Sequence, residues 1–287
     1  MDVMVAQSAG FCYGVKRAVD MARDTAHRGE PCVMLGSIIH NANVVAELEA
    51  LGMRKAESWQ EVLPGETVVI RSHGEKKEVF EKLEELGARC VNATCPNVLR
   101  IQQLVAQAQE EGRTPLIIGE PLHPEVMGVA SWSDRSVILP GPAELEKWLA
   151  EDESRRALPL TAAAQTTCVR TIWESSKEIL KKQCTNAKIF DTICNATHRR
   201  QAEAADLAAK VDVMVVVGDR KSANTKHLAE ICREKCGRVV QIERAGELSS
   251  DLFEGCLVAG LTAGASTPAG IIKEVYTTMS EEIKNME

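Results

Sequence analysis

Aromatic residues are scarce in this chain of 287 residues, which has four Trp, four Phe and two Tyr. Hydrophobic residues still make up 45%, so the core must be built mainly from Ala, Val, Leu and Ile. The chain also lacks an excess of basic residues, because its formal net charge is -7. Without a basic face we expect no nucleic-acid partner, although a local pocket can still bind an anionic small molecule.

Targeting and membrane signals are also missing. The start, Met1-Asp2-Val3-Met4-Val5, has no basic stretch followed by a long apolar one, so we expect no signal peptide. The longest apolar run, around Val213–Val217, is far too short to span a bilayer. We therefore expect a cytoplasmic protein that does not contact a membrane. In that reducing compartment ten cysteines indicate metal binding or catalysis rather than disulfides.

Apolar, β-rich runs alternate with helical patterns along the whole chain, which is typical of parallel α/β units. The expected strands include Val3–Ala6, Cys32–Leu35, Thr67–Ile70 and Val211–Val217. The expected helices include Val15–His27, Asn43–Leu51, Lys77–Leu86 and a last one from about Ala269 to Ile283. The length suits two or three small domains better than one core.

Three segments repeat the same pattern of a strand, a cysteine and a helix, at Cys12, Cys95 and Cys194. Twenty-four residues after each cysteine stands a glycine that ends a strand, namely Gly36, Gly119 and Gly218. Twenty-eight residues after each stands a polar residue that opens a helix, namely His40, His123 and Ser222. A further strand and polar loop follow in each repeat, at Arg71–Gly74, Gln165–Thr167 and Ala263–Ser266.

This periodicity predicts three similar small α/β domains, at residues 1–87, 88–186 and 187–287. Ligands of parallel sheets bind at the carboxyl ends of the strands, and every loop named above leaves such an end. If the domains form a pseudo-threefold trefoil, these loops converge on one central cavity.

The three equivalent cysteines are separated by far more than the short Cys-x-x-Cys spacings of zinc sites. One thiolate from each repeat suits three corners of a 4Fe–4S cluster. A fourth, apical iron would then stay open to a substrate oxygen. The alternative is that Cys12, Cys95 and Cys194 are small apolar core residues. We favour the cluster, which predicts a soluble redox enzyme.

The other seven cysteines have no equivalents in the three repeats, and we expect most of them to be structural. Cys168 differs from them because it follows Gln165-Thr166-Thr167 and therefore lies near the expected cavity. Whether it reaches the cavity stays open.

Polar residues at the expected helix starts and strand ends make a ring of hydrogen-bond donors. They are His40, His73, His123, Thr166, Thr167, Ser222, Asn224 and Ser266. Backbone N–H groups and the helix dipole favour an anion there, and a diphosphate has enough charge and acceptors to use them all. Ser, Thr and Asn are equally the preferred N-caps, so capping remains an alternative for each. No Walker-type motif is present, which argues against nucleoside triphosphates.

Glu125 stands in the segment His123-Pro124-Glu125-Val126. Proline followed by an acid is an ordinary helix start. The same carboxyl can instead donate a proton inside the cavity, relayed through a threonine hydroxyl or a water. The residues alone leave both interpretations open.

Taken together, these motifs resemble the 4-hydroxy-3-methylbut-2-enyl diphosphate reductase family, also called the LytB family, over essentially the whole chain. The resemblance is carried by Gly10–Val15, His40-Asn41, Ser72–Gly74, Ala93–Pro96, His123–Val126, Gln165–Thr167, Cys194–Thr197, Ser222–Thr225 and Thr262–Ser266. It implies a trefoil of three α/β domains around a 4Fe–4S cluster. It also implies reductive loss of the substrate's allylic hydroxyl, which yields isopentenyl and dimethylallyl diphosphates.

The resemblance also implies a role for each matched residue. Cys12, Cys95 and Cys194 would be cluster ligands. The diphosphate would be bound by His40, His73, His123, Ser222, Asn224 and Ser266. Glu125 would supply protons beside His123, with Thr166 positioning both the carboxyl and the substrate hydroxyl.

One residue departs from the family pattern, which commonly has two serines before the asparagine: the second position here is Ala223. Either the Ala223 backbone N–H suffices, or the diphosphate is held more weakly at that corner. No Gly-x-Gly-x-x-Gly fingerprint follows a strand, so we expect electrons from reduced ferredoxin or flavodoxin. The alternatives are another open-cluster enzyme, such as a hydro-lyase, and a zinc-stabilised anion-binding module.

Overall fold

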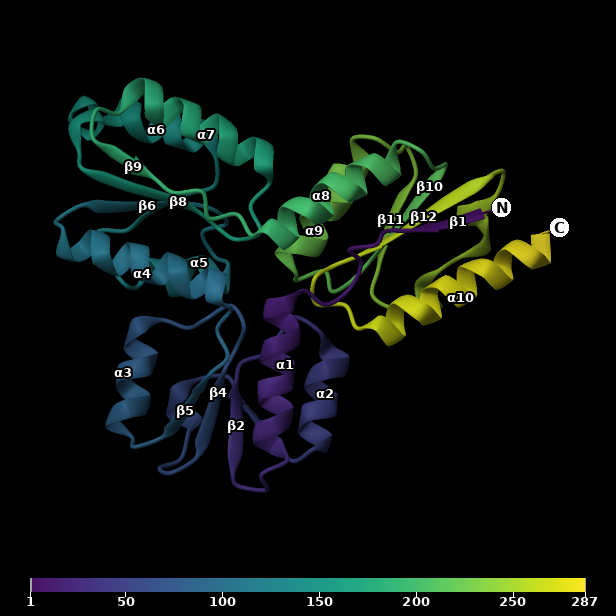
Figure 1. Ribbon diagram of the computed structural model, residues 1–287, viewed down its shortest axis with the longest axis horizontal. Helices are drawn as coiled ribbons and strands as arrows, with labels where there is room; N and C mark the ends of the chain where they lie inside the picture. Colours follow the sequence, from purple (N-terminus) through teal and green to yellow (C-terminus); the bar gives the residue numbers. More distant parts are fainter. Residues whose placement is uncertain (1, 287) are drawn as a thin grey trace. The chain divides into compact units, whose positions relative to one another are not determined.

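Three four-stranded sheets form the framework of the computed structural model, which describes residues 2–286 and side chains as far as Glu281 (Figure 1). The first sheet has the order β3 (Arg54–Ala56), β2 (Cys32–Leu35), β4 (Thr67–Ile70) and β5 (Arg89–Asn92). The second has the order β7 (Val137–Leu139), β6 (Thr114–Ile118), β8 (Leu160–Ala164) and β9 (Ala187–Ile189). The third has the order β11 (Val239–Ile242), β10 (Val213–Val217), β12 (Val258–Ala263) and β1 (Asp2–Val5).

Every strand pair in these sheets is parallel. The three sheets also share one order of strands. When the strands of each sheet are counted along the chain, with β1 counted last in the third sheet, the second strand lies at one edge and pairs with the first. Parallel pairing requires crossover connections, and helices supply them here. The expectation of three similar small α/β domains is therefore confirmed.

The described helices are α1 (Tyr13–Ala26), α2 (Ala42–Ala50), α3 (Lys77–Glu85), α4 (Pro96–Glu110), α5 (Pro124–Ala130), α6 (Pro142–Glu151), α7 (Arg170–Gln183), α8 (Asn195–Ala208), α9 (Ala223–Arg233) and α10 (Ala269–Met286). The expected helices agree with α1, α2, α3 and α10 to within a few residues at each end. Within residues 2–286 no helix is both long and apolar enough to cross a bilayer.

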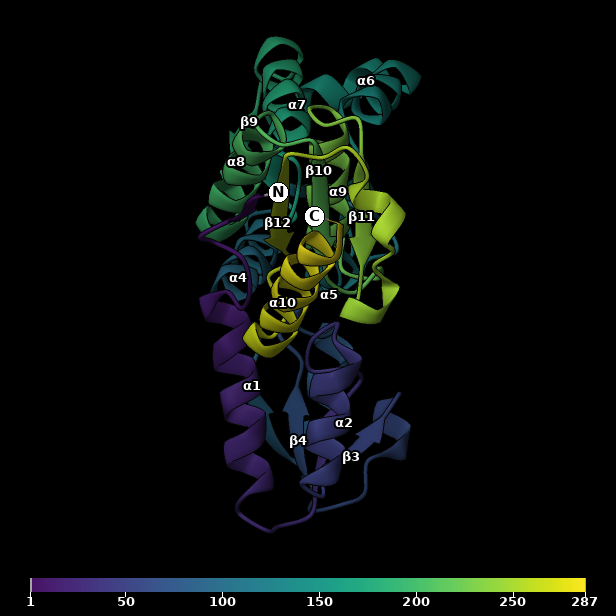
Figure 2. The same ribbon diagram turned by 90° about the vertical axis from the view of Figure 1, so that its right-hand side faces the viewer.

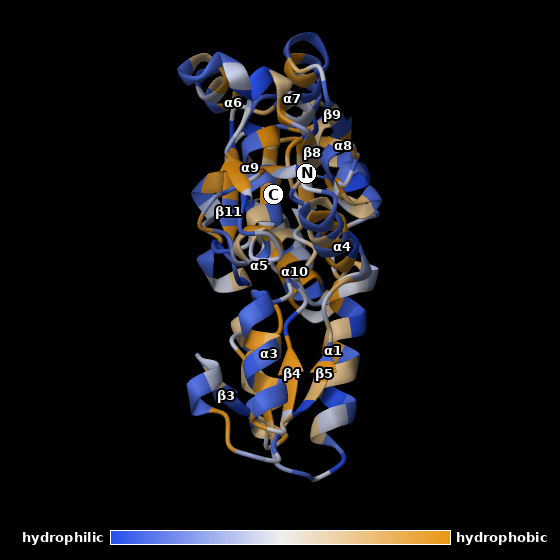
Figure 3. Ribbon diagram, turned by 90° about the vertical axis from the view of Figure 1, so that its left-hand side faces the viewer, coloured by the Kyte–Doolittle hydropathy of each residue, from blue (hydrophilic) through white to orange (hydrophobic). Residues whose placement is uncertain are grey.

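The chain folds into two compact units, residues 16–194 and residues 2–15 with 195–286. In the first unit, β2 and β4 are fully buried and bear helices on both faces (Figure 1). Leu35 and Ile70 pack with Leu83 of α3 on one face. Figure 3 shows β4 in the orange of apolar residues beside a largely blue α3, the pattern of an amphipathic helix on a buried strand.

The second sheet of this unit divides its side chains in the same way, because neighbouring residues of a strand point to opposite faces. Leu116 and Ile118 of β6 pack with Trp173 of α7, together with α6. Ile117, between them in sequence, packs with Ile101 of α4 and with α5. With so few aromatic residues, Trp173 is the largest fully buried side chain, and the rest of the core is aliphatic as expected.

The other unit is built around the third sheet. Met214 and Val216 of β10 pack against α8 and α9, whereas Val215 packs against α10 on the opposite face. Figure 2 shows α10 lying over the strands of this sheet. The N-terminal strand β1 pairs with β12, so the first residues of the chain complete a sheet formed by the last third.

The sheets do not follow the expected boundaries near residues 87 and 186. Each strand that leads to a cysteine pairs with the sheet before it: β5 with β4, and β9 with β8. The strand β1 likewise pairs with β12 of the last third, so those boundaries would separate an edge strand from each of the three sheets. The reason is that a sequence period gives the length of a repeat but not the point at which one sheet ends.

Candidate active site

In each sheet, three of the loops at the carboxyl ends of the strands carry candidate site residues. The loop after the edge strand carries the cysteine, and its backbone N–H donates a hydrogen bond to the loop after the neighbouring strand. Cys95 donates to Ser72 O (2.9 Å), Cys194 to Thr166 O (3.0 Å) and Cys12 to Ala265 O (3.2 Å). Each of the three cysteines thus makes the same kind of main-chain hydrogen bond, in addition to standing at an equivalent position of the sequence repeat.

The three thiols are half-buried and form no disulfide. The sulfur atoms of Cys194 and Cys12 each accept a hydrogen bond, which favours a thiolate ligand. The Asn97 side-chain amide donates to Cys194 Sγ at 3.2 Å, and the Val15 N–H donates to Cys12 Sγ at 3.4 Å. Among the described residues no three His, Cys, Asp or Glu side chains form a site for a single metal ion.

Several of the remaining cysteines are structural, as expected. Cys32, Cys232 and Cys236 are buried in the core. Cys168 lies in the core of the second sheet, where burial above all, and then the charges of Glu125 and Glu120, raise the pKa of its thiol to about 12. It therefore stays protonated at neutral pH and is a poor metal ligand.

Three histidines come together in the unit of residues 16–194. The ring centroids of His40 and His73 are 4.4 Å apart, and that of His123 lies 6.0 Å from His40 and 5.8 Å from His73. His40 follows β2, His73 follows β4, and His123 is the N-cap of α5 in the second sheet. Loops of two different sheets thus form one cluster, which we call the histidine cluster.

Within this cluster, the ring of His73 is biased toward its neutral form. Burial above all, then the charges of His40, His123 and Arg71, hold the pKa of His73 well below its ordinary value. The Nδ1 atom of His73 is buried without a hydrogen-bond partner. The Nδ1 atom of His123 accepts the Glu125 N–H at 3.1 Å, so a neutral His123 carries its proton on Nε2.

Glu125 is buried, with 3% of its surface exposed, in the first turn of α5. Its Oε1 accepts the Thr166 N–H and its Oε2 accepts the Thr166 hydroxyl, both at 2.7 Å. Burial raises the pKa of this carboxyl, whereas the two bonds from Thr166 lower it. An acid in the first turn of a helix needs no such partner, so the deep burial and the two bonds from Thr166 go beyond what a helix start requires.

In the other unit, the loops after β10 and β12 meet at Gly218. A Cβ atom at Gly218 would lie 2.7 Å from the Thr225 hydroxyl and 2.8 Å from that of Thr267. Beside these residues, both side-chain atoms of Asn224 and the hydroxyl of Ser266 are buried without partners. Native proteins rarely leave buried polar atoms unpaired, so these atoms indicate a polar ligand.

Ser222 and Ala223 form the start of α9. The Ser222 hydroxyl accepts the Thr225 N–H at 3.4 Å and so acts as the N-cap, the alternative that its sequence left open. Ala223 is the first helical residue, and its backbone N–H therefore has no partner within the helix. Alanine at this position still offers its backbone N–H as a hydrogen-bond donor, although it lacks the side-chain hydroxyl of a serine.

The sequence motifs contain Arg71 and Gln165 but did not predict a role for either residue. Arg71 directly follows β4 and Gln165 directly follows β8, and each side chain lies over the glycine that ends the neighbouring strand. A Cβ atom at Gly36 would lie 2.9 Å from Arg71 Nη1, and one at Gly119 would lie 2.8 Å from Gln165 Cβ. Their equivalent positions in the repeats were the available signal. Asn97, which contacts Cys194, had no such signal.

The chain matches the LytB protein family over residues 3–280. It is 38% identical to the 4-hydroxy-3-methylbut-2-enyl diphosphate reductase of Caldanaerobacter subterraneus subsp. tengcongensis, over 100% of this chain and 98% of the relative. It is 41% identical to the enzyme of the same name from Anaeromyxobacter sp. (strain K), over 96% and 97% of the two chains.

Solved structures of reductases with related names are also similar to this chain. A structure of (E)-4-hydroxy-3-methyl-but-2-enyl diphosphate reductase, the terminal enzyme of the non-mevalonate pathway, is 34% identical, with a TM-score of 0.69 over 98% of this chain and 99% of that one. The Plasmodium falciparum E-1-hydroxy-2-methyl-but-2-enyl-4-diphosphate reductase is 23% identical and has a TM-score of 0.91 over 97% and 88%, a likeness of fold. The match over nearly the whole sequence and these full-length relatives establish that the chain belongs to the LytB family.

Proposed function

We propose that this chain is a 4-hydroxy-3-methylbut-2-enyl diphosphate reductase. The reaction breaks the allylic C–O bond, consumes two electrons and two protons, and yields water with isopentenyl or dimethylallyl diphosphate. The observation that carries the proposal is the buried Glu125–Thr166 pair beside the histidine cluster. A proton source and an anion site in one place are what this reaction needs, and the full-length relatives bear its name.

The cofactor we propose is a 4Fe–4S cluster held by Cys12, Cys95 and Cys194, with an open apical iron. Soft thiolate donors suit such a cluster, and the shared main-chain contact of the three cysteines fits one ligand per repeat. The hydrogen bonds to Cys12 and Cys194 are of the kind that tune cluster potential. When bound, the cluster would supply electrons and a Lewis-acidic iron for the leaving hydroxyl.

Glu125 would provide protons through Thr166. The Thr166 hydroxyl lies within hydrogen-bond distance of the Glu125 carboxyl, and it donates to that group when the carboxyl is ionised. When Glu125 is protonated, the carboxylic acid can instead donate to the Thr166 oxygen while the Thr166 hydroxyl donates to the departing oxygen. A proton can then pass from Glu125 through Thr166 to the departing oxygen without crossing bulk water. The raised pKa of Glu125 serves this role because a larger fraction of the carboxyl is protonated near neutral pH.

The histidine cluster, with Ser222, Asn224 and Ser266, would bind the diphosphate. His73 Nδ1, the Asn224 amide and the Ser266 hydroxyl offer unpaired buried atoms, and a diphosphate would pair them. Burial and the neighbouring charges hold the pKa of His73 well below its ordinary value, so this ring is neutral before a ligand binds. Binding a diphosphate should therefore draw protons onto it, since a nearby negative charge raises a histidine pKa.

The electrons would come from a reduced ferredoxin or flavodoxin, because the sequence lacks a dinucleotide fingerprint.

The protein should be reconstituted without oxygen and given the hydroxylated allylic diphosphate with a chemically reduced viologen. We expect both isomeric diphosphates by mass spectrometry and NMR. Turnover without any reductant would indicate a hydro-lyase instead, and a colourless protein with bound zinc would indicate an anion-binding module. Full turnover with NADPH alone would exclude the carrier-protein donor.

A further inference from the structure

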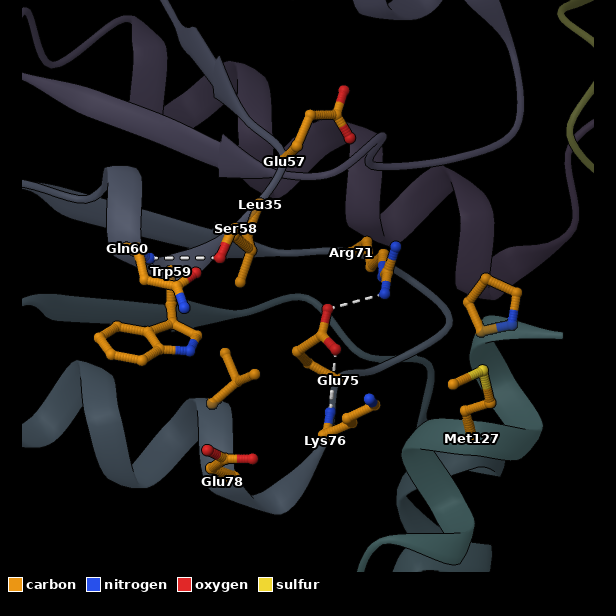
Figure 4. Close-up of a pocket in the computed structure, with 12 residues that line it drawn as sticks. Leu35, Glu57, Ser58, Trp59, Gln60, Arg71, Glu75, Lys76, Glu78 and Met127 are labelled. Carbon is orange, nitrogen blue, oxygen red and sulfur yellow. Dashed lines mark hydrogen bonds and ion pairs between the residues drawn. The ribbon is translucent and has the colours of Figure 1, made fainter. Parts of the chain in front are cut away.

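We propose that the ion pair between Arg71 and Glu75 is a positioning pair, which holds the histidine cluster in register across two sheets. The inference rests on the proposed function only in assigning a diphosphate to that cluster. Neither residue belongs to the ligands proposed above. Figure 4 shows the pair, with Arg71 and Glu75 pointing toward one another at the centre of the view.

Arg71 ties together the loops that carry His40 and His73. Its guanidinium Nη2 contacts Glu75 Oε2 at 2.7 Å, and its Nε donates to Gly74 O at 3.3 Å, which closes the turn around His73. Its Nη1 lies against Gly36, at the start of the loop that leads to His40. The side chains of Arg71 and Glu75 are only 21% and 11% exposed, so solvent screens the pair less than a surface pair.

Glu75 extends the connection to the second sheet. Its Oε1 accepts the Lys76 N–H at 3.0 Å, which fixes the carboxylate on its second oxygen. Its backbone carbonyl accepts the Gln102 amide of α4 at 3.4 Å. Gly128 of α5 packs on it so closely that an added Cβ would lie 3.3 Å from Glu75 C and O. Helix α5 carries His123 and Glu125, so the Glu75 backbone seats the helix that brings both to the cluster.

The second sheet has the same arrangement with a different side chain. Gln165, the equivalent of Arg71, lies over Gly119 and its Oε1 accepts the Glu120 N–H at 3.0 Å. It thereby fastens the loop that leads to His123. An arginine in one sheet and a glutamine in the other thus fasten the loop after the neighbouring strand. Because two different side chains make this contact, we infer that the fold requires the contact itself.

The ion pair is also reachable. It forms one wall of a cavity of about 460 Å³ whose lining includes Trp59, Lys76 and Met127 (Figure 4). A substitution that shortens Arg71 therefore opens onto space rather than creating a sealed void. We expect such variants to fold, so that their effect on the histidines can be measured separately from stability.

The test compares Arg71→Gln, Glu75→Gln and the double variant with the wild type, all reconstituted without oxygen and labelled at histidine with nitrogen-15. The chain has six histidines, so their ring signals can be assigned by single substitutions. We expect both single variants to shift the signals of His40, His73 and His123. Both should weaken the binding of inorganic diphosphate at least tenfold, and the double variant should lose no more than the worse single one.

The matched control is Arg54→Gln, which breaks a similar pair with Glu66 (2.8 Å) at the amino ends of the same sheet's strands. It should leave the cluster signals and diphosphate binding unchanged. Arg71→Lys keeps the positive charge but not the several donors of the guanidinium group, and it should weaken diphosphate binding less than Arg71→Gln does. Unchanged cluster signals in Arg71→Gln and Glu75→Gln would overturn the inference. Shifted signals in a protein whose wild type does not bind diphosphate would uphold it and refute the proposed function.

Discussion

Replacing Glu125 with glutamine tests the proton source with little change of shape. The side-chain amide can keep both contacts, because its oxygen can accept the Thr166 N–H and its nitrogen can donate to the Thr166 oxygen. Only the transferable proton is lost. A positioned general acid contributes roughly 10²–10⁴ in rate. We therefore expect kcat to fall by that factor, about 2.7–5.4 kcal/mol in barrier height at 1.36 kcal/mol per tenfold.

The assay follows kcat with a chemically reduced viologen, alongside iron content and diphosphate affinity. Glu125→Gln should keep the iron and the affinity of the wild type. The matched control is Glu144→Gln, an exposed acid in the first turn of α6, which also begins with a proline. It should turn over normally. If both variants lose the same small amount, Glu125 is a helix cap and the proposed proton route is wrong.

The same substitution predicts a change of stability with pH. Burial raises the pKa of Glu125 in the folded protein, so this carboxyl stabilises the fold most below its ordinary value of 4.5. That stabilisation is lost as the pH rises through the raised pKa. Glutamine never ionises, so the free energy of unfolding of Glu125→Gln should gain on the wild type as the pH rises. Urea denaturation at several pH values measures the difference.

Three further substitutions have defined outcomes. Cys95→Ser should lose iron and activity together, whereas Cys184→Ser, equally half-buried, should keep both by iron analysis. Thr166→Val removes one bond that lowers the Glu125 pKa, so the pH at which kcat declines should rise. The value of kcat itself should fall at least tenfold, since a lost bond to a charged group is worth about 1.5–3 kcal/mol. Ala223→Ser should tighten inorganic diphosphate binding several-fold by calorimetry; no change would mean that the backbone N–H already suffices.

Much of the fold follows from the sequence because its signals are local. The alternation of apolar runs and helical patterns predicts the strands and helices, and the positions of Gly36, Gly119 and Gly218 at strand ends are confirmed. The polar loops also leave the carboxyl ends of strands, as the parallel pattern predicts. The sequence did not predict that β5 pairs with β4 across the boundary expected near residue 87, because strand pairing depends on contacts that no periodicity records.

The details of the site depend on contacts between distant residues. The bond between Glu125 and Thr166 joins residues 41 apart, and sequence alone left Glu125 divided between cap and acid. The closeness of His73 to His123 depends on how two sheets of one unit pack. Arg71 and Glu75 have the spacing of a helical ion pair but stand in a turn, so no helix pattern pointed to them.

The most direct test of the central claim is Mössbauer spectroscopy of protein labelled with iron-57 and purified without oxygen, with and without the hydroxylated allylic diphosphate. We expect a four-iron cluster with one distinct iron whose signal changes when the substrate is added. An iron-free protein, or four equivalent irons that ignore the substrate, would contradict the proposed open-site mechanism.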